Sequence, residues 1–117
     1  MRIGELAKKS NVSTSRIRFY EANKLLPKAR RDGNGYREYP DVAVETLRII
    51  VDAQRLGFSL NEIRYGLAEA SPHRPSRKAI HEALQCKLVD IDQHIRDAKT
   101  RRREIVRLLK EFGEKRE

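Results

Sequence analysis

Apolar residues return at helical spacing along the N-terminal part of the chain, and they predict two short helices separated by a break at Asn11. The first helix has an apolar stripe with steps of three and one: Ile3, Leu6 and Ala7. The second covers residues 13–21, where Ser13 is a good N-cap because its hydroxyl can accept hydrogen bonds from the unpaired amides of the first turn. Helix, tight turn and helix within about twenty residues is the outline of a helix-turn-helix, whose second helix enters the major groove of DNA.

The start of this second helix carries polar side chains that we expect to be exposed. They are Thr14, Ser15, Arg16 and Arg18. Hydroxyls, guanidinium groups and a helix N-terminus bind phosphate oxygens and base edges, so the segment predicts a DNA-reading helix. The alternative is an ordinary capped surface helix with solvated arginines.

Residues 24–39 have a different character and predict a two-stranded hairpin. Pro27 ends the helical region, and residues 32–35 (Asp-Gly-Asn-Gly) supply the types that tolerate a positive φ in a turn. Basic and tyrosine side chains flank the turn: Arg30, Arg31, Tyr36, Arg37 and Tyr39. Such a hairpin beside a helix-turn-helix indicates a wing that lies over the phosphate backbone or the minor groove. A hairpin that only covers a small core is the alternative.

Two more helices follow. The third opens at Pro40 and Asp41 and ends at Gly57, and its expected buried face is Val44, Leu47, Ile50 and Val51. Ser59 and Glu62 form a capping box that starts a fourth helix, packed by Leu60, Ile63 and Leu67. Arg55, at the junction, can reach a phosphate or form a salt bridge. Residues 1–70 are therefore expected to form one DNA-binding domain.

The last part of the chain has a different period. Residues 71–76 contain two prolines and no apolar residue, which predicts a linker, and residues 77–112 predict one long helix before a tail at 113–117. Apolar positions alternate in steps of four and three, interrupted only by Arg102: Leu84, Leu88, Ile91, Ile95, Ala98, Ile105, Leu109 and Phe112. Such a heptad seam needs a partner, most simply a second copy in a two-helix coiled coil. A charge at Arg102 is costly there unless it is paired.

Charge favours a polyanionic partner. The chain has 26 Lys and Arg against 17 Asp and Glu, a net charge of +9, and residues 1–40 hold 10 basic and 4 acidic side chains. Basic side chains gain affinity for nucleic acid by releasing counterions. No apolar run approaches a membrane span and no signal peptide is visible, so a cytoplasmic protein with no membrane partner is expected. No set of residues has a recognisable catalytic spacing, which argues against an enzyme.

Four motifs, taken together and in this order, resemble the MerR family of bacterial transcriptional regulators. They are Ile3-Gly4-Glu5-Leu6-Ala7; Ile17-Arg18-Phe19-Tyr20-Glu21 with Leu25-Leu26-Pro27; Asn34-Gly35-Tyr36-Arg37-Glu38-Tyr39; and residues 53–63, Ala-Gln-Arg-Leu-Gly-Phe-Ser-Leu-Asn-Glu-Ile. The resemblance implies a mainly α fold, in which a winged helix-turn-helix precedes a long antiparallel coiled-coil dimerisation helix. It also implies the short form of the family, without a C-terminal effector domain.

The function implied by this resemblance is that of a homodimeric regulator on a pseudo-palindromic promoter. Family members often bend and untwist an overlong promoter spacer so that RNA polymerase can use it, and this distortion has a sequence-dependent energy. Carried over by position, the DNA contacts fall on Arg16, Arg18, Tyr20, Arg31, Tyr36 and Arg37, with Thr14, Ser15 and Arg55 as weaker candidates. The main alternative is an RNA-binding basic coiled-coil protein.

Sensing is where the chain departs from the family. Metal-responsive members have a cysteine at the start of the dimerisation helix and others after it, whereas this helix starts with Ser76, Arg77 and Lys78. We therefore expect no metal site and no cofactor. Cys86, the only cysteine, is the one candidate thiol sensor, and an ordinary residue on the outer side of the helix is the alternative.

Overall fold

The computed structural model describes residues 1–68 and 76–113. The tail 114–117 and the predicted linker, apart from Ser76, lie outside the described residues. The chain divides into two compact units, residues 1–80 and 81–117, and each is described by itself. None of the helices in the described ranges is both long and apolar enough to cross a membrane.

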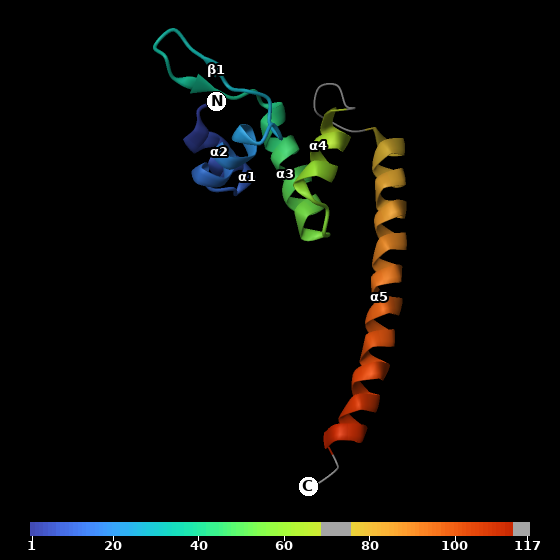
Figure 1. The fold of residues 1–117 in the computed structure, drawn as a ribbon. Coiled ribbons are helices and arrows are strands. Elements are labelled where there is room, and N and C mark those ends of the chain that lie inside the picture. The colour runs from blue at the N-terminus through green and yellow to red at the C-terminus, as the bar shows by residue number, and fades with distance from the viewer. Residues whose placement is uncertain (69–75, 114–117) are drawn as a thin grey trace. The chain divides into compact units, whose positions relative to one another are not determined.

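The first two helices form the predicted helix-turn-helix (Figure 1). Helix α1 is Ile3–Ser10 and helix α2 is Thr14–Ala22. Asn11 ends α1 in the left-handed region at φ 58°, a conformation that asparagine tolerates better than most residues. Ser13 is the N-cap of α2, and its Oγ accepts a hydrogen bond from the Arg16 amide at 3.2 Å. Both the break and the cap predicted from the sequence are confirmed.

The hairpin has two short antiparallel strands, β1 (Arg30–Arg31) and β2 (Arg37–Glu38). Arg30 lies opposite Glu38 and Arg31 opposite Arg37. The turn is closed by the Gly35 amide, which donates to the Asp32 carbonyl at 3.0 Å, and Gly35 has a φ of 82° that glycine adopts without strain. The hairpin and its turn residues are therefore as predicted.

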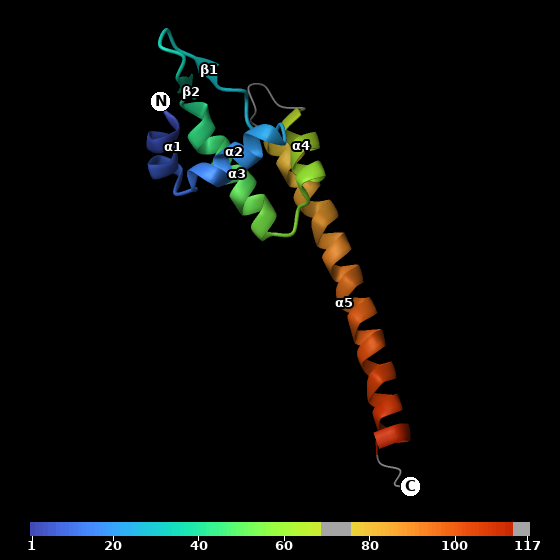
Figure 2. The ribbon, with the colours of Figure 1, turned by 60° about the vertical axis from the view of Figure 1, so that its left-hand side comes forward.

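Helix α3 is Val42–Arg55 and helix α4 is Leu60–Ala68 (Figure 2). Gly57, at φ 95°, ends α3, where the Phe58 amide donates to the Ala53 carbonyl and the Gly57 amide to the Gln54 carbonyl. These two bonds are those of a Schellman motif. The predicted capping box is present: the Glu62 amide donates to the Ser59 Oγ at 3.1 Å, and the Ser59 amide to the Glu62 Oε1 at 2.9 Å.

A single apolar core holds the N-terminal unit together. Its buried members are Leu6, Val12, Ile17, Tyr20, Leu25, Leu26, Tyr39, Ala43, Leu47, Ile50, Ile63 and Leu67. Helix α3 is central, because it packs against both α1 and α4. Val51 is 39% exposed, so its predicted place on the buried face of α3 is wrong; Thr46 is buried on that face instead and donates to the Val42 carbonyl.

Helix α5, Arg77–Gly113, is the long helix that the heptad pattern predicts. No residue of this helix is buried in the single chain. The seam therefore lies open along the helix, with Leu88 59% and Leu109 63% exposed. The mainly α fold, with a winged helix-turn-helix and a long C-terminal helix, is confirmed.

Candidate nucleic-acid interface

The N-terminal part of α2 presents the side chains that the sequence predicts. Ser15, Arg16 and Arg18 are exposed and Thr14 is half-buried, while Ile17 on the opposite side is fully buried. The Arg18 side chain makes no hydrogen bond or ion pair within residues 1–68 and 76–113. A solvated guanidinium on a helix anchored by its opposite face can turn toward base edges or phosphates.

Tyr20 is the exception among the predicted contacts. Its side chain is only 2% exposed and lies in the core, and its hydroxyl donates to the Gln54 Oε1 of α3 at 2.5 Å. The structure therefore places Tyr20 in the core and not on the exposed face of α2, and its role as a DNA contact stays a prediction. The physical reason is its helical position, three residues after Ile17 and so on the same buried face. Phe19, 43% exposed, is the aromatic residue of α2 that faces solvent.

Glu21, at the end of α2, holds the hairpin against this helix. Its Oε1 accepts from the Tyr39 hydroxyl at 2.8 Å and from the Arg37 Nη1 at 3.2 Å. Its Oε2 accepts from the Ala29 amide at 2.8 Å. One carboxylate thus contacts the segment before β1, the strand β2 and the residue after it, so the hairpin and α2, the predicted recognition helix, form one surface.

Arg37 was predicted to bind DNA, and the structure places it in this cluster. Its ion pair with Glu21 leaves the arginine side chain 49% exposed, so the guanidinium is positioned and still accessible. Burial raises the pKa of the Tyr39 hydroxyl above its usual range, and the hydrogen bond to Glu21 raises it further. The phenol therefore stays protonated and remains a donor at neutral pH.

Asp32 organises the tip of the hairpin. Its Oδ1 accepts from the Asn34 amide at 2.9 Å and from the Tyr36 amide at 3.1 Å. The Asn34 hydrogen bond lowers the pKa of the Asp32 carboxyl below its usual range, and the Tyr36 amide and Arg2 act in the same direction. The turn is therefore held by an ionised side chain.

The predicted wing residues Arg31 and Tyr36 lie on this tip. Arg31 donates from Nη1 to the Gly35 carbonyl at 2.9 Å, and Tyr36 is 56% exposed. Arg2 lies over the Tyr36 ring, with its guanidinium carbon 4.2 Å from the ring centroid, and forms an ion pair with Asp32 at 3.4 Å. Sequence reasoning missed Arg2 as a neighbour of the wing, because only the fold brings the start of the chain beside the hairpin.

Arg55 lies at the end of α3. It forms a salt bridge with Asp52, which is the alternative that the sequence leaves open. Its Nη2 is 3.3 Å from the Asp52 Oδ1, and both side chains are exposed. An exposed pair of this kind contributes about 0–1 kcal/mol, so a phosphate can displace the aspartate at little cost. The structure leaves Arg55 available as a contact without assigning it to one.

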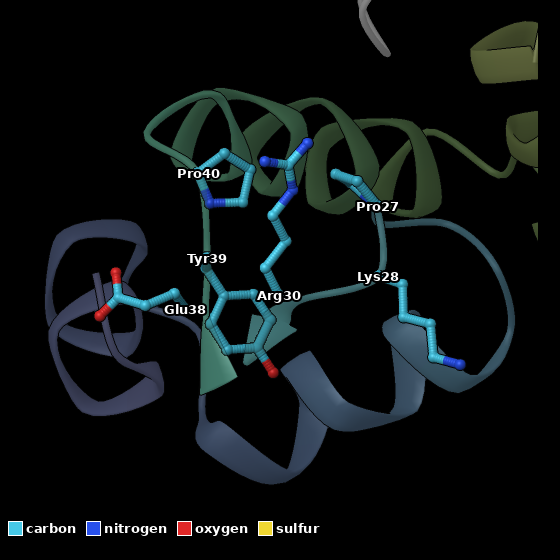
Figure 3. A pocket seen from close by; sticks show the side chains of 6 residues that line it. All are labelled: Pro27, Lys28, Arg30, Glu38, Tyr39 and Pro40. Carbon is cyan, nitrogen blue, oxygen red and sulfur yellow. The ribbon is translucent and has the colours of Figure 1, made fainter. Parts of the chain in front are cut away.

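An open pocket lies at the base of the hairpin (Figure 3). It is lined by Pro27, Lys28, Arg30, Glu38, Tyr39 and Pro40 and has a volume of about 470 Å³. Arg30 extends between the two prolines, whereas the Lys28 amine points outward. The two cations add positive charge to the hairpin side of the domain.

The chemistry of these residues is recognition of a polyanion. A capped helix start with exposed hydroxyls and guanidinium groups lies beside a rigid basic hairpin, and within the described ranges no three His, Cys, Asp or Glu side chains gather as metal ligands. Cys86 is an exposed free thiol on α5, and its role as a sensor stays a prediction.

Comparison with known families agrees with this geometry. Residues 1–69 match the family described as MerR HTH family regulatory protein, and residues 44–108 match the family described as MerR, DNA binding. The chain belongs to the MerR family. It is therefore a transcriptional regulator with a DNA-binding domain, in a family of regulators and not of enzymes. The RNA-binding alternative has no support from these matches.

Individual relatives cover nearly the whole chain. The transcriptional regulator CueR of Yersinia pestis is 36% identical over 113 residues, which are 95% of this chain and 80% of CueR. The crystal structure of the regulator MerR of Bacillus megaterium with mercury(II) is 33% identical, with a TM-score of 0.70, and the match covers 96% of this chain and 86% of that one. The regulator PbrR691 of Ralstonia metallidurans, solved with lead(II), is 26% identical with a TM-score of 0.77, covering 94% and 86%.

The residues of this MerR-family chain do not support a binding site for the metals found in these two structures. Soft thiophilic metals prefer thiolate ligands. The chain has one cysteine, which is exposed, and the described ranges contain no cluster of potential ligands. The residues that the structure describes do not fit such a site.

Proposed function

We propose that the protein binds a pseudo-palindromic promoter as a homodimer and regulates transcription by changing the shape of the promoter. The observation that carries the proposal is the Glu21 cluster, which joins the recognition helix and the hairpin into one basic surface. A joined helix and wing can contact the major groove and the adjacent backbone at the same time.

Each side chain has a role that follows from its chemistry. Arg16 and Arg18, with Thr14 and Ser15, would contact base edges and phosphates from the start of α2. Arg31, Tyr36 and Arg37 would bind backbone phosphates from the hairpin, where guanidinium and phenol groups are good donors. Arg55 would add a phosphate contact from the last residue of α3. Supporting this set, all of these side chains except Thr14 are exposed in the single chain.

A homodimer supplies the second half-site contact that one small domain lacks. The open heptad seam of α5 supports pairing with a second copy. A dimer that holds two recognition helices at a fixed separation can bend and untwist the DNA between them, and the energy of this distortion depends on the spacer sequence. We propose that RNA polymerase at the same promoter, in the bacterial cytoplasm, responds to this change in spacer geometry.

The experiment that tests the proposal selects genomic fragments bound by the purified protein and maps the protected bases. The expected result is an inverted repeat with two protected half-sites, protein dimers on each site, and an affinity that falls steeply with salt. Structured RNA should compete poorly. Equal competition by RNA and duplex DNA, or protection of a single unrepeated site, would overturn the proposal.

A further inference from the structure

Among the charged side chains of α5 that make no hydrogen bond or ion pair within the part of the chain that the structure describes, three lie on the open seam or along one edge of it. They are Asp92, Lys99 and Arg102. Other charges on the same helix are paired within it: Arg107 contacts Glu104 and Glu111. The three side chains are exposed in the single chain and therefore free to meet charges of a second helix.

The heptad positions decide which charges can meet. Asp92 and Lys99 each follow directly after a seam residue, Ile91 and Ala98, so they lie along the same edge of the seam. When two copies of a helix pack antiparallel, each edge of one seam lies beside the same edge of the other. Asp92 then lies beside a partner residue on this same edge. Which residue that is changes with each shift of the register by one heptad.

Charge distinguishes these registers. In one register, called the central register below, Ile95 lies opposite the partner's Ala98 and Asp92 lies beside the partner's Lys99. The two-fold symmetry of the pair repeats this contact, so it occurs twice. A shift of one heptad in one direction places Lys99 against the partner's Lys99, and a shift in the other places Asp92 against the partner's Asp92. Like charges in such positions are destabilising, so the central register is the electrostatically favourable one of these three.

Arg102 gives an independent reason for the same register. It occupies a seam position, where a charge needs a counter-ion. In the central register it lies opposite the partner's Ile91 and next to the partner's Asp92. The two shifted registers instead place it next to the partner's Lys99 or Gln85. The partner's Asp92 can therefore pair with both Lys99 and Arg102 in the central register, and in neither shifted register.

We infer that α5 pairs with a second copy of itself in this antiparallel register, fixed by Asp92 of each chain between Lys99 and Arg102 of its partner. The inference rests on the homodimer proposed above. It places the two-fold axis between residues 96 and 97, and so it fixes how far apart the two ends of the paired helices lie.

Charge reversal tests the pairing in the full chain. We expect D92K and K99E each to weaken self-association by about tenfold or more, because each homodimer then contains two repulsive contacts. Mixing the two variants should restore tight association as a heterodimer. D90K and K110E are matched controls, since they make the same charge changes on the outer side of α5 and should leave association unchanged. A loss no larger than that of the controls would overturn the inference.

The native Cys86 gives a second measurement, because it is exposed and off the seam. In the inferred register, nitroxide labels on the two Cys86 side chains are separated by about 30 Å along the coiled coil, given 1.5 Å per helical residue. A slip of one heptad changes this axial separation by about 10 Å, and parallel helices in register would reduce it to about zero and leave only the distance across the coiled coil. Pulsed electron spin resonance on the labelled protein measures the resulting distance between the labels.

The outcomes separate the two proposals. A wild-type protein that stays monomeric in sedimentation at micromolar concentration would overturn both the homodimer and the inferred register. A dimer with a Cys86 separation typical of a slipped or parallel pair would overturn only the register. A dimer with the expected separation and selective weakening by D92K and K99E would establish the inferred pairing.

Discussion

The Tyr39 hydroxyl donates to the Glu21 carboxylate across 2.8 Å, and this bond joins the residue that follows the wing to the last turn of the recognition helix. Tyr39 is buried and the Glu21 side chain is only 9% exposed, so water competes poorly for the contact. A hydrogen bond to a buried ionised group is stronger than a neutral one. Glu21 therefore anchors the wing to α2, while Arg2 holds the tip of the hairpin through Asp32 and Tyr36.

Replacing Glu21 with Gln should loosen the hairpin. The amide keeps one acceptor but presents an NH₂ group toward donors, so it cannot accept from both the Tyr39 hydroxyl and the Ala29 amide. We expect a loss of about 1–3 kcal/mol in the free energy of unfolding, together with weaker operator binding. Thermal unfolding followed by circular dichroism measures the first effect. Glu5→Gln is the control, because Glu5 has an exposed ion pair with Lys9 and should change stability by about 0.5 kcal/mol at most.

Replacing Arg18 with Ala should weaken DNA binding without unfolding the domain. The side chain is exposed and unpaired within the described residues, so its loss removes no internal contact. If Arg18 meets a base edge, the cost is about 1–3 kcal/mol per half-site and sequence preference relaxes at one position. If it meets a phosphate, the salt dependence becomes shallower instead. Titrations at several salt concentrations distinguish these cases, with Lys110→Ala as a charge-matched control. Unchanged affinity would contradict the proposed docking.

Replacing Leu88 with Glu should abolish dimerisation, and tight operator binding with it. Leu88 lies on the seam and is 59% exposed in the single chain. Its neighbour Val89 is 64% exposed but lies off the seam, so Val89→Glu is a control of similar exposure and equal charge. Sedimentation equilibrium compares the two variants. Equal dimer loss in both would show that the heptad seam does not define the interface.

Local chemistry made most of the fold predictable. The Ser13 cap, the Gly57 helix end and the Ser59–Glu62 capping box each follow from hydrogen-bonding groups a few residues apart, and all are confirmed. The burial of Tyr20 and the exposure of Val51 do not follow from local pattern, because they depend on which elements pack around each helix. The Glu21 cluster joins residues as many as 18 positions apart, so no local pattern indicates it.

The hairpin tip should also depend on pH through Asp32. Its pKa is lowered in the folded state, chiefly by the Asn34 amide, so its stabilising effect is fully present above the ordinary aspartate pKa of about 4. This effect is lost as the pH falls through the lowered pKa, because the protonated carboxyl is a weaker acceptor. We expect the Asn34 and Tyr36 amide resonances to shift toward disordered values below about pH 4. In Asp32→Asn, which keeps an acceptor oxygen, this titration should vanish while the turn remains. In Asp32→Ala, which has no acceptor, the tip should be loosened at every pH. A wild-type tip that stays unchanged well below the ordinary pKa would show that the turn residues alone, without the ionised side chain, hold the hairpin.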